Sequence, residues 1–141
     1  MEQNTLPTTM EPSEDQSQIR DLIEQWCAAV RRKDYDGALK RHSANMLMFD
    51  VPGPFQSEGL EAYRKTWELF FGCMTEPATF HFSDIRITAG ADVAFVTAHG
   101  HCYSPNEQGV SEPLDFRLTM GLRKIAGEWI IEHEHHSVPA P

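Results

Sequence analysis

Residues 114–137 read LDFRLTMGLRKIAGEWIIEHEHHS, and this stretch decides the fold class. Apolar and polar residues alternate along both halves, which is typical of β-strands with one buried face. Ala126-Gly127 separates the halves and suits a two-residue hairpin turn. The stretch therefore predicts two antiparallel strands, over 114–125 and 128–137.

Two earlier stretches, 79–88 and 93–104, show the same alternation. A tight turn is expected over 89–92, and a longer loop is expected over 105–113. A short strand over 46–50 should end at the Pro/Gly turn that follows it, because proline cannot donate to a ladder. Most of the strands follow the helical part of the chain, which predicts an α+β fold with a four-strand antiparallel meander.

The first half of the chain has helical periodicity. Ser13 and Gln16 form a capping-box pattern, and an apolar stripe with a 3.6-residue period follows it to Val30. These signals predict a helix that begins at Ser13 and closes on the basic residues 31–33. A short second helix is expected over 34–43, and a third after Ser57, with its apolar side continuing to Met74.

Residues 1–12 contain two prolines and have no periodicity, so we expect a disordered acidic tail there, followed by a single domain over 13–141. The 141-residue chain has 12 Lys and Arg against 21 Asp and Glu, a formal net charge of −9. This balance argues against nucleic-acid and anionic-membrane partners. Three cysteines without Cys-x-x-Cys spacing, and the lack of a signal or membrane-spanning segment, predict a cytoplasmic protein.

A two-residue turn would pair Arg117 with His136 and Thr119 with Glu134. The polar face would then gather side chains from three neighbouring strands: His99, His101, Arg117, Thr119, Glu134 and His136. A three-residue loop would instead turn His133 and His135 to this face. The alternative interpretation is that this is only the solvated face of an amphipathic sheet, with the helices covering the opposite face around Phe116, Leu118 and Met120.

Short motifs in a fixed order indicate a family. They are Asp34-Tyr35-Asp36, Phe49-Asp50-x-Pro52-Gly53-Pro54, Gly59-Leu60-Glu61-Ala62-Tyr63-Arg64 with Trp67, Asp92-Val93-Ala94-Phe95, Arg117-x-Thr119, Arg123-Lys124, Gly127-x-Trp129 and His133-Glu134-His135-x-Ser137-x-Pro139. Together they resemble the SnoaL-like, ketosteroid-isomerase-like branch of the nuclear transport factor 2-like superfamily, over residues 15–139. The last motif is also similar to the association domain of calcium/calmodulin-dependent kinase II.

The resemblance implies a cone-shaped barrel in which a strongly curved sheet wraps around helices and leaves a pocket. It also implies that the polar face looks inward and that the apolar sheet face supports a homodimer contact. By position, Asp50 matches the proton-shuttling aspartate of the steroid isomerase, and Thr119 lies near its second acid. Arg117 matches a pocket arginine of the kinase association domain. Trp26 stands at the position of the oxyanion tyrosine and lacks its acidic hydroxyl. Together with Thr119 near the position of the second acid, the chain departs from the isomerase at two positions.

We expect four catalytic residues: Asp50, His101, Arg117 and Glu134. Asp50 would be the base if burial raises its pKa, and the alternative is a surface aspartate that caps a turn. The residues expected to bind the ligand are Trp26, Tyr63, Trp67, His99, Thr119 and His136. For the three aromatic residues in this set, core packing is the alternative role.

No metal or other cofactor is expected. The two His-x-His pairs lie on strands two apart, with a cationic arginine between them, and the sequence has no phosphate loop or dinucleotide fingerprint. We expect a small-molecule-binding domain that acts as a cofactor-free isomerase, cyclase or dehydratase by proton transfer on an apolar, carbonyl-containing ligand. The alternative is a non-catalytic ligand-binding or oligomerisation module in which Arg117 and His136 hold a small carboxylate. In both cases the partner chain would be a second copy in a homodimer.

Overall fold

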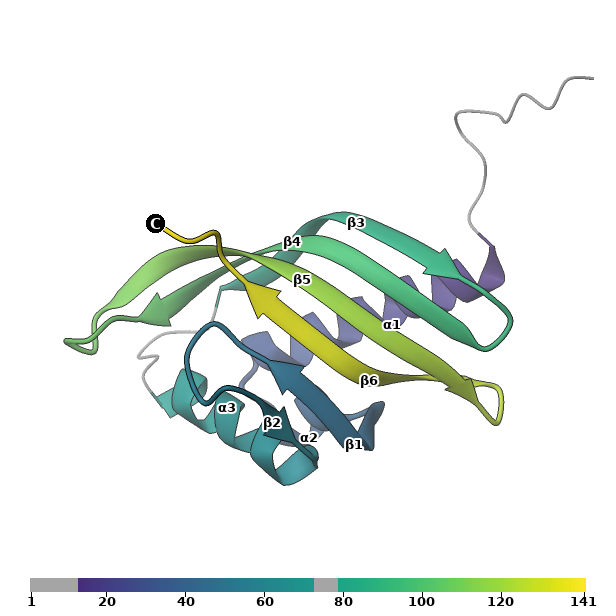
Figure 1. Cartoon of the computed structure of the whole chain (residues 1–141), viewed down its shortest axis with the longest axis horizontal. Helices are drawn as coiled ribbons and strands as arrows, with labels where there is room; N and C mark the ends of the chain where they lie inside the picture. Colours follow the sequence, from purple (N-terminus) through teal and green to yellow (C-terminus); the bar gives the residue numbers. More distant parts are fainter. Residues whose placement is uncertain (1–12, 73–78) are drawn as a thin grey trace, which may run out of the picture.

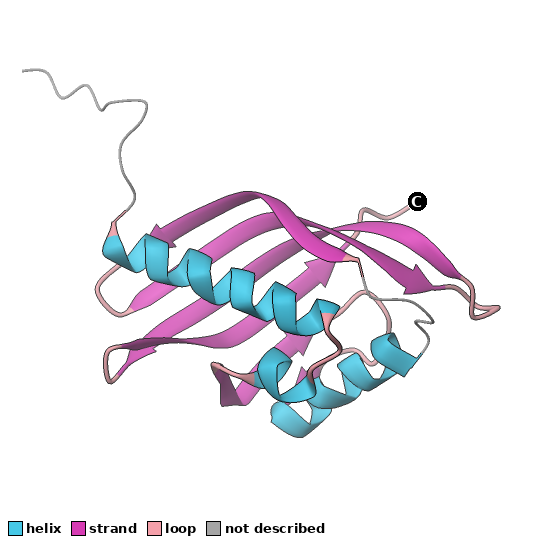
Figure 2. Ribbon diagram, turned by 180° about the vertical axis from the view of Figure 1, so that it is seen from behind, coloured by secondary structure: helices cyan, strands magenta, loops and turns pink. Residues whose placement is uncertain are grey.

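The structure is a computed structural model that describes residues 13–72 and 79–141. Helices α1 (Glu14–Arg31), α2 (Tyr35–Leu39) and α3 (Leu60–Gly72) lie against one face of a curved sheet (Figure 2). The strands are β1 (His42–Phe49), β2 (Ser57–Glu58), β3 (Phe80–Ala89), β4 (Val93–Pro105), β5 (Ser111–Ile125) and β6 (Glu128–Ser137). The predicted α+β fold is confirmed.

The six strands have the order β2-β1-β6-β5-β4-β3 (Figure 1). The pairs from β3 to β6 are antiparallel, which confirms the predicted meander. Strand β1 pairs in parallel with β6. This long-range pairing makes β1 a strand from His42 onwards, where a helix over 34–43 was expected.

The ends of other elements differ slightly from the sequence prediction. Strands β4 and β5 continue into the expected 105–113 loop, so that only a short turn remains, closed by the bond that the Asn106 backbone N–H donates to the Val110 carbonyl. The predicted tail at 1–12 and the predicted end of the third helix at Met74 lie outside the described residues. No helix in the described part of the chain is long and apolar enough to span a membrane.

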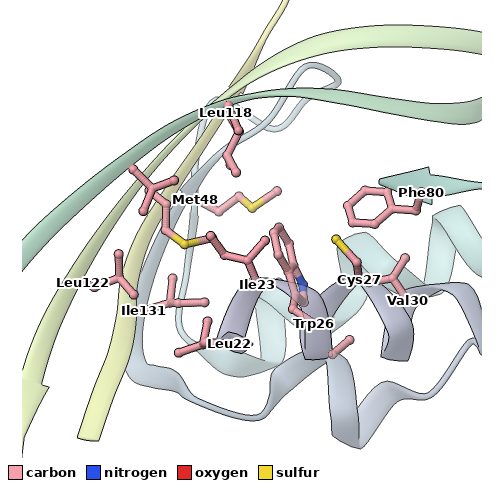
Figure 3. Packing of buried hydrophobic residues seen from close by; sticks show 14 of the residues in the cluster. Leu22, Ile23, Trp26, Cys27, Val30, Met48, Phe80, Leu118, Leu122 and Ile131 are labelled. Atoms are coloured by element: carbon pink, nitrogen blue, oxygen red, sulfur yellow. The ribbon is translucent and has the colours of Figure 1, made fainter. Parts of the chain in front are cut away.

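Helix α1 begins as the sequence predicts. The Ser13 hydroxyl accepts from the Gln16 backbone N–H at 3.1 Å, and the Gln16 side chain accepts from the Ser13 N–H at 2.9 Å. The apolar stripe of α1 is buried against the sheet (Figure 3). Within it, the Trp26 ring contacts His42 of β1 and Phe80 and Phe82 of β3. At the other end, Arg31 donates to the backbone carbonyl of Phe80 on β3, which ties the helix to the sheet edge.

The β5–β6 hairpin has the expected turn but not the expected register. Ala126 and Gly127 both have positive φ, 52° and 82°, as a two-residue type I′ turn requires. Pairing holds from the turn to Leu122 opposite Ile131, and then shifts by one residue, so that Gly121 pairs with His133. Glu132 is the extra residue of a β-bulge.

The bulge exchanges the faces of the last strand. Beyond it, Met120 pairs with Glu134 and Leu118 with His136, so the expected pairs Arg117–His136 and Thr119–Glu134 are wrong. Because side chains alternate along a strand, one additional residue turns every later side chain of β6 to the opposite face. Glu134 and His136 thereby point to the face that carries Leu118 and Met120.

The face that the helices cover is the apolar one. Phe116, Leu118, Met120 and Leu122 of β5 are all at most 5% exposed. The expectation that the polar face would look inward is therefore wrong. The physical reason is that the apolar stripes of the helices can be removed from water only by contact with an apolar surface.

Candidate functional site

A cavity of about 460 Å³ lies between α3, the β1–β2 connection and the ends of β4 and β5. Most of its lining is apolar, including Met48, Trp67, Leu69, Phe70, Phe80, Leu114 and Phe116. The lining residues that can carry a charge near neutral pH are Asp50, Lys65 and His136. An apolar cavity with a few converging polar groups is the usual form of a small-molecule site.

Glu134 is the most deeply buried charged group beside this cavity, with no exposed surface. Its Oε2 accepts from the Tyr63 hydroxyl at 2.8 Å and from His42 Nε2 at 2.6 Å, and its Oε1 accepts from His136 Nε2 at 3.1 Å. Burial alone would raise the Glu134 pKa, but the bonds from His136 and His42 outweigh it and lower the pKa to about 2. Glu134 is therefore ionised at neutral pH.

His42 compensates the charge of Glu134. Its Nε2 faces the Glu134 carboxylate, and its Nδ1 faces the backbone carbonyl of Lys40 at 3.2 Å. Both neighbours carry hydrogen-bond acceptors, so each ring nitrogen of His42 faces an acceptor. Its side chain is fully buried and stacks on Tyr63, with ring centroids 4.5 Å apart. Burial followed by the Glu134 charge raises the pKa of Tyr63 well above its ordinary value, so Tyr63 stays a neutral donor.

His136 connects the buried carboxylate to the cavity. Its Nε2 donates to Glu134, while its Nδ1 lies 3.6 Å from Oδ1 of Asp50. The ring stacks on Phe116, with centroids 5.0 Å apart, and this contact fixes its orientation. His136 therefore presents one nitrogen, Nδ1, towards Asp50 in the cavity wall.

Asp50 follows the last residue of β1, and its side chain is 25% exposed. Burial raises the Asp50 pKa, and the charge of His136 and the Val51 N–H, which donates to Oδ1 at 2.8 Å, only partly oppose this. Asp50 is thus a stronger proton acceptor than an exposed aspartate. Asp50 is partly buried in the cavity wall, and it also accepts from the N–H of the turn residue Val51.

The structure separates the expected site residues into two groups. Asp50, Trp67 and His136 line the cavity, and Glu134 lies behind His136. Tyr63 is buried in the core and contacts Glu134 instead of the cavity. Three of the expected polar residues therefore lie close together: Asp50, Glu134 and His136.

The second group lies on the outer face of the sheet, so its expected position in the pocket is wrong. His99 pairs with Asp84 at 3.1 Å, and His101 pairs with Asp115 at 2.9 Å. Arg117 is exposed and donates to the Ser137 hydroxyl, and Thr119 is exposed as well. The prediction assigned the polar face of the sheet to the pocket, whereas the odd-numbered residues of β4 and β5, which form that face, point away from the helices.

Trp26 is buried among aromatic side chains of the core and does not line this cavity. It lines a second cavity of about 310 Å³ between α1, Lys40–Arg41 and the β5–β6 turn. This second cavity is lined largely by polar side chains, and Arg41 in its wall approaches Glu128 at 3.8 Å. Trp26 therefore has the packing role that was the alternative to ligand binding.

Sequence reasoning missed His42 and the lining residues Phe80, Leu114 and Phe116. His42 lies 92 residues from Glu134 in the chain, and no local pattern indicates that they meet. Leu114 and Phe116 could have been found from the alternation in β5, if the apolar face had been assigned to the helices. Within the described residues, no group of three or more His, Cys, Asp and Glu side chains is arranged to hold a metal ion.

Comparisons with known proteins identify the family. The family of the SnoaL-like domain matches residues 19–141. A nuclear transport factor 2-like protein of unknown function from Pseudomonas putida KT2440 is 32% identical, with a TM-score of 0.79, over 89% of this chain and 87% of that chain. No curated protein matches the chain.

Two solved structures of lower identity show the same fold. A ketosteroid isomerase-like protein from Erwinia carotovora atroseptica SCRI1043 is 20% identical, with a TM-score of 0.74, over 92% of this chain and all (100%) of that chain. A nuclear transport factor 2 superfamily protein from Salmonella enterica serovar Typhimurium LT2 is 17% identical, with a TM-score of 0.74, over 89% and 91%. The resemblance seen in the sequence motifs is confirmed, and the chain belongs to the SnoaL-like domain family of the nuclear transport factor 2-like superfamily.

Proposed function

We propose that the cavity binds a small, largely apolar molecule and catalyses proton transfer on it, with Asp50 as the base and His136 as its acid partner. The observation that carries this proposal is the pairing of these two groups, 3.6 Å apart, in the wall of an otherwise apolar cavity. The fold supports small-molecule binding, whereas the proposed proton transfer is inferred from the Asp50–His136 pair.

Charge balance favours this assignment. In this proposal the charge of the ionised Glu134 is balanced by the buried His42 ring whose Nε2 faces it. Asp50 and the Nδ1 atom of His136 then share one proton, either as an ion pair or as two neutral groups. A pair with a single proton can accept a proton from a carbon atom at one group and return a proton at the other. This is the requirement of a carbonyl isomerisation, a cyclisation or a dehydration.

Glu134 acts through His136 as a positioning residue. By accepting from Nε2 it keeps the proton on that nitrogen and leaves Nδ1 for the cavity, as the carboxylate of a catalytic triad does for its histidine. The bonds from His42 and Tyr63 in turn hold the carboxylate in place. A ligand that fills this largely apolar cavity would displace water from it, which strengthens electrostatic interactions with the ligand.

The experiment measures proton abstraction from a carbon atom and does not require the natural substrate to be known. β-Tetralone, a small apolar ketone, is incubated with the protein in D₂O, and exchange of its α-hydrogens is followed by NMR. We expect catalysed exchange with the wild type, and a loss of about 100-fold or more in the Asp50→Asn variant, as for removal of a general base. Asp115→Asn, which alters an exposed aspartate on the outer face, is the matched control and should keep the rate.

Equal exchange rates in the wild type and Asp50→Asn would refute the role of Asp50. Binding of the ketone without exchange would instead support the alternative, a non-catalytic ligand-binding module. That module would not hold its ligand between Arg117 and His136, because these side chains lie on opposite faces of the sheet.

The apolar face of the sheet, expected to support a homodimer contact, is buried under the helices, so that expectation is wrong. We propose instead that the chain forms a homodimer through the outer face of the sheet. Four large apolar side chains are 41–54% exposed on β4 and β5: Val93, Phe95, Tyr103 and Ile125. Contact with a second copy would remove them from water. Analytical ultracentrifugation should give the mass of a dimer for the wild type and of a monomer for Phe95→Glu. A wild-type monomer at micromolar concentration would refute this proposal.

A further inference from the structure

We propose that the natural ligand is amphipathic, with an anionic group that binds Lys65 and an apolar body that extends to Asp50 and His136. A carboxylate is the simplest such group. This inference rests on the proposed function, because it assigns the ligand of the same cavity.

Lys65 is a cation in the cavity wall. It lies on α3, is exposed and lines the cavity. None of the ion pairs among the described residues includes it, and the preceding residue is different: Arg64 pairs with Glu68 at 3.6 Å and lies over the Tyr35 ring. The ammonium group of Lys65 is therefore available to a ligand.

The other ionisable groups of the cavity determine the orientation of an anionic ligand. Asp50 would repel a second anion, and it makes no ion pair with Lys65 within the described structure. Cys102 also lines the cavity, but burial raises its pKa to about 12 and keeps it neutral. An anionic ligand thus has one favourable orientation, with its charge at Lys65 and its uncharged, reactive part at the Asp50–His136 pair.

The surface next to Lys65 is apolar. Leu69 follows Lys65 by one helical turn, lines the cavity and is 71% exposed. A cation beside an exposed leucine, above a cavity walled by Trp67 and Phe70, complements a molecule that joins an anionic end to an apolar body. The chain as a whole carries a net charge of −9, so this position is locally opposite in sign to the average surface.

The test compares two fluorescent probes that differ in one charge. Anilinonaphthalene sulfonate is apolar and anionic, and N-phenylnaphthylamine has the same ring skeleton without the sulfonate. Both are titrated into the wild type, Lys65→Met and Arg20→Met. Arg20 is an exposed cation on α1 that lines neither cavity, and its variant controls for net charge. Ala62→Trp, which fills the cavity wall, reports whether the probes bind there.

We expect Lys65→Met to weaken binding of the sulfonate about 3-fold, as for an exposed ion pair, and to leave binding of the neutral probe unchanged. Added salt should weaken sulfonate binding to the wild type and not to Lys65→Met. Arg20→Met should bind both probes as the wild type does, and Ala62→Trp should bind neither.

Two outcomes would overturn the inference in different ways. If both probes bind in the cavity and Lys65→Met changes neither affinity, the anionic ligand is refuted, while the proton-transfer function stands. If neither probe binds, or if Ala62→Trp leaves both affinities unchanged, the cavity is not the ligand site, and the proposed function fails with it.

Discussion

Replacing Glu134 with glutamine tests the buried charge network directly. The substitution keeps the size of the side chain and removes its negative charge. It leaves the Nε2 atom of the fully buried His42 and the Nε2 atom of His136 without their carboxylate partner. Removing one member of a buried ion pair is strongly destabilising, because the other charge stays buried and uncompensated.

The magnitude follows from the pKa of Glu134. A lowering from 4.5 to about 2 corresponds to about 3 kcal/mol of stability at neutral pH, at about 1.4 kcal/mol per pKa unit. The folded state has the lower pKa and therefore binds fewer protons than the unfolded state. This contribution is fully present above pH 4.5 and is lost as the pH falls towards 2.

The assay is urea denaturation followed by tryptophan fluorescence, at pH 7 and at a series of lower values. We expect Glu134→Gln to lower the free energy of unfolding by about 3 kcal/mol at pH 7, with a difference from the wild type that shrinks as the pH falls below 4.5. The control is Glu132→Gln on the same strand, whose exposed pair with Arg123 should contribute less than about 1 kcal/mol. Equal losses for the two variants, or a constant difference at all pH values, would refute the reasoning.

Three further predictions follow from single positions. A Cβ atom at Gly100 would lie 2.2–2.6 Å from atoms of the Phe116 ring. Gly100→Ala should therefore lower the free energy of unfolding in urea by about 1–3 kcal/mol. The control Gly53→Ala, with open space around its Cβ atom, should lower it by less than about 0.5 kcal/mol. Ser13→Ala removes the α1 cap and should lower the unfolding free energy by about 1 kcal/mol, which the same titration measures. Burial raises the folded-state pKa of Asp50, so the ionised form of Asp50 lowers the stability of the protein as the pH rises through that pKa. At pH 7, the thermal unfolding temperature of Asp50→Asn should therefore equal or exceed that of the wild type. A clearly lower unfolding temperature would contradict this.

The sequence by itself determined the elements whose signals are local. The Ser13 cap and the 3.6-residue stripe define α1, and the alternation after residue 79 defines the meander. The Ala126-Gly127 turn was identified from two residues, because both must adopt positive φ in a hairpin of this type. Asp50 was expected as a site residue because the motif Phe49-Asp50-x-Pro52-Gly53-Pro54 resembles the ketosteroid-isomerase-like branch, in which an aspartate occupies this position.

Only the tertiary structure decided which side chains meet. Glu132 bulges out of the β5–β6 ladder, and this single residue turns Glu134 and His136 inward while Arg117 stays outside. The parallel pairing of β1 with β6 then brings His42 to Glu134 across 92 residues. Alternation along a strand is a relative pattern: it says which residues share a face, whereas the packing of helices on the sheet determines which face is buried.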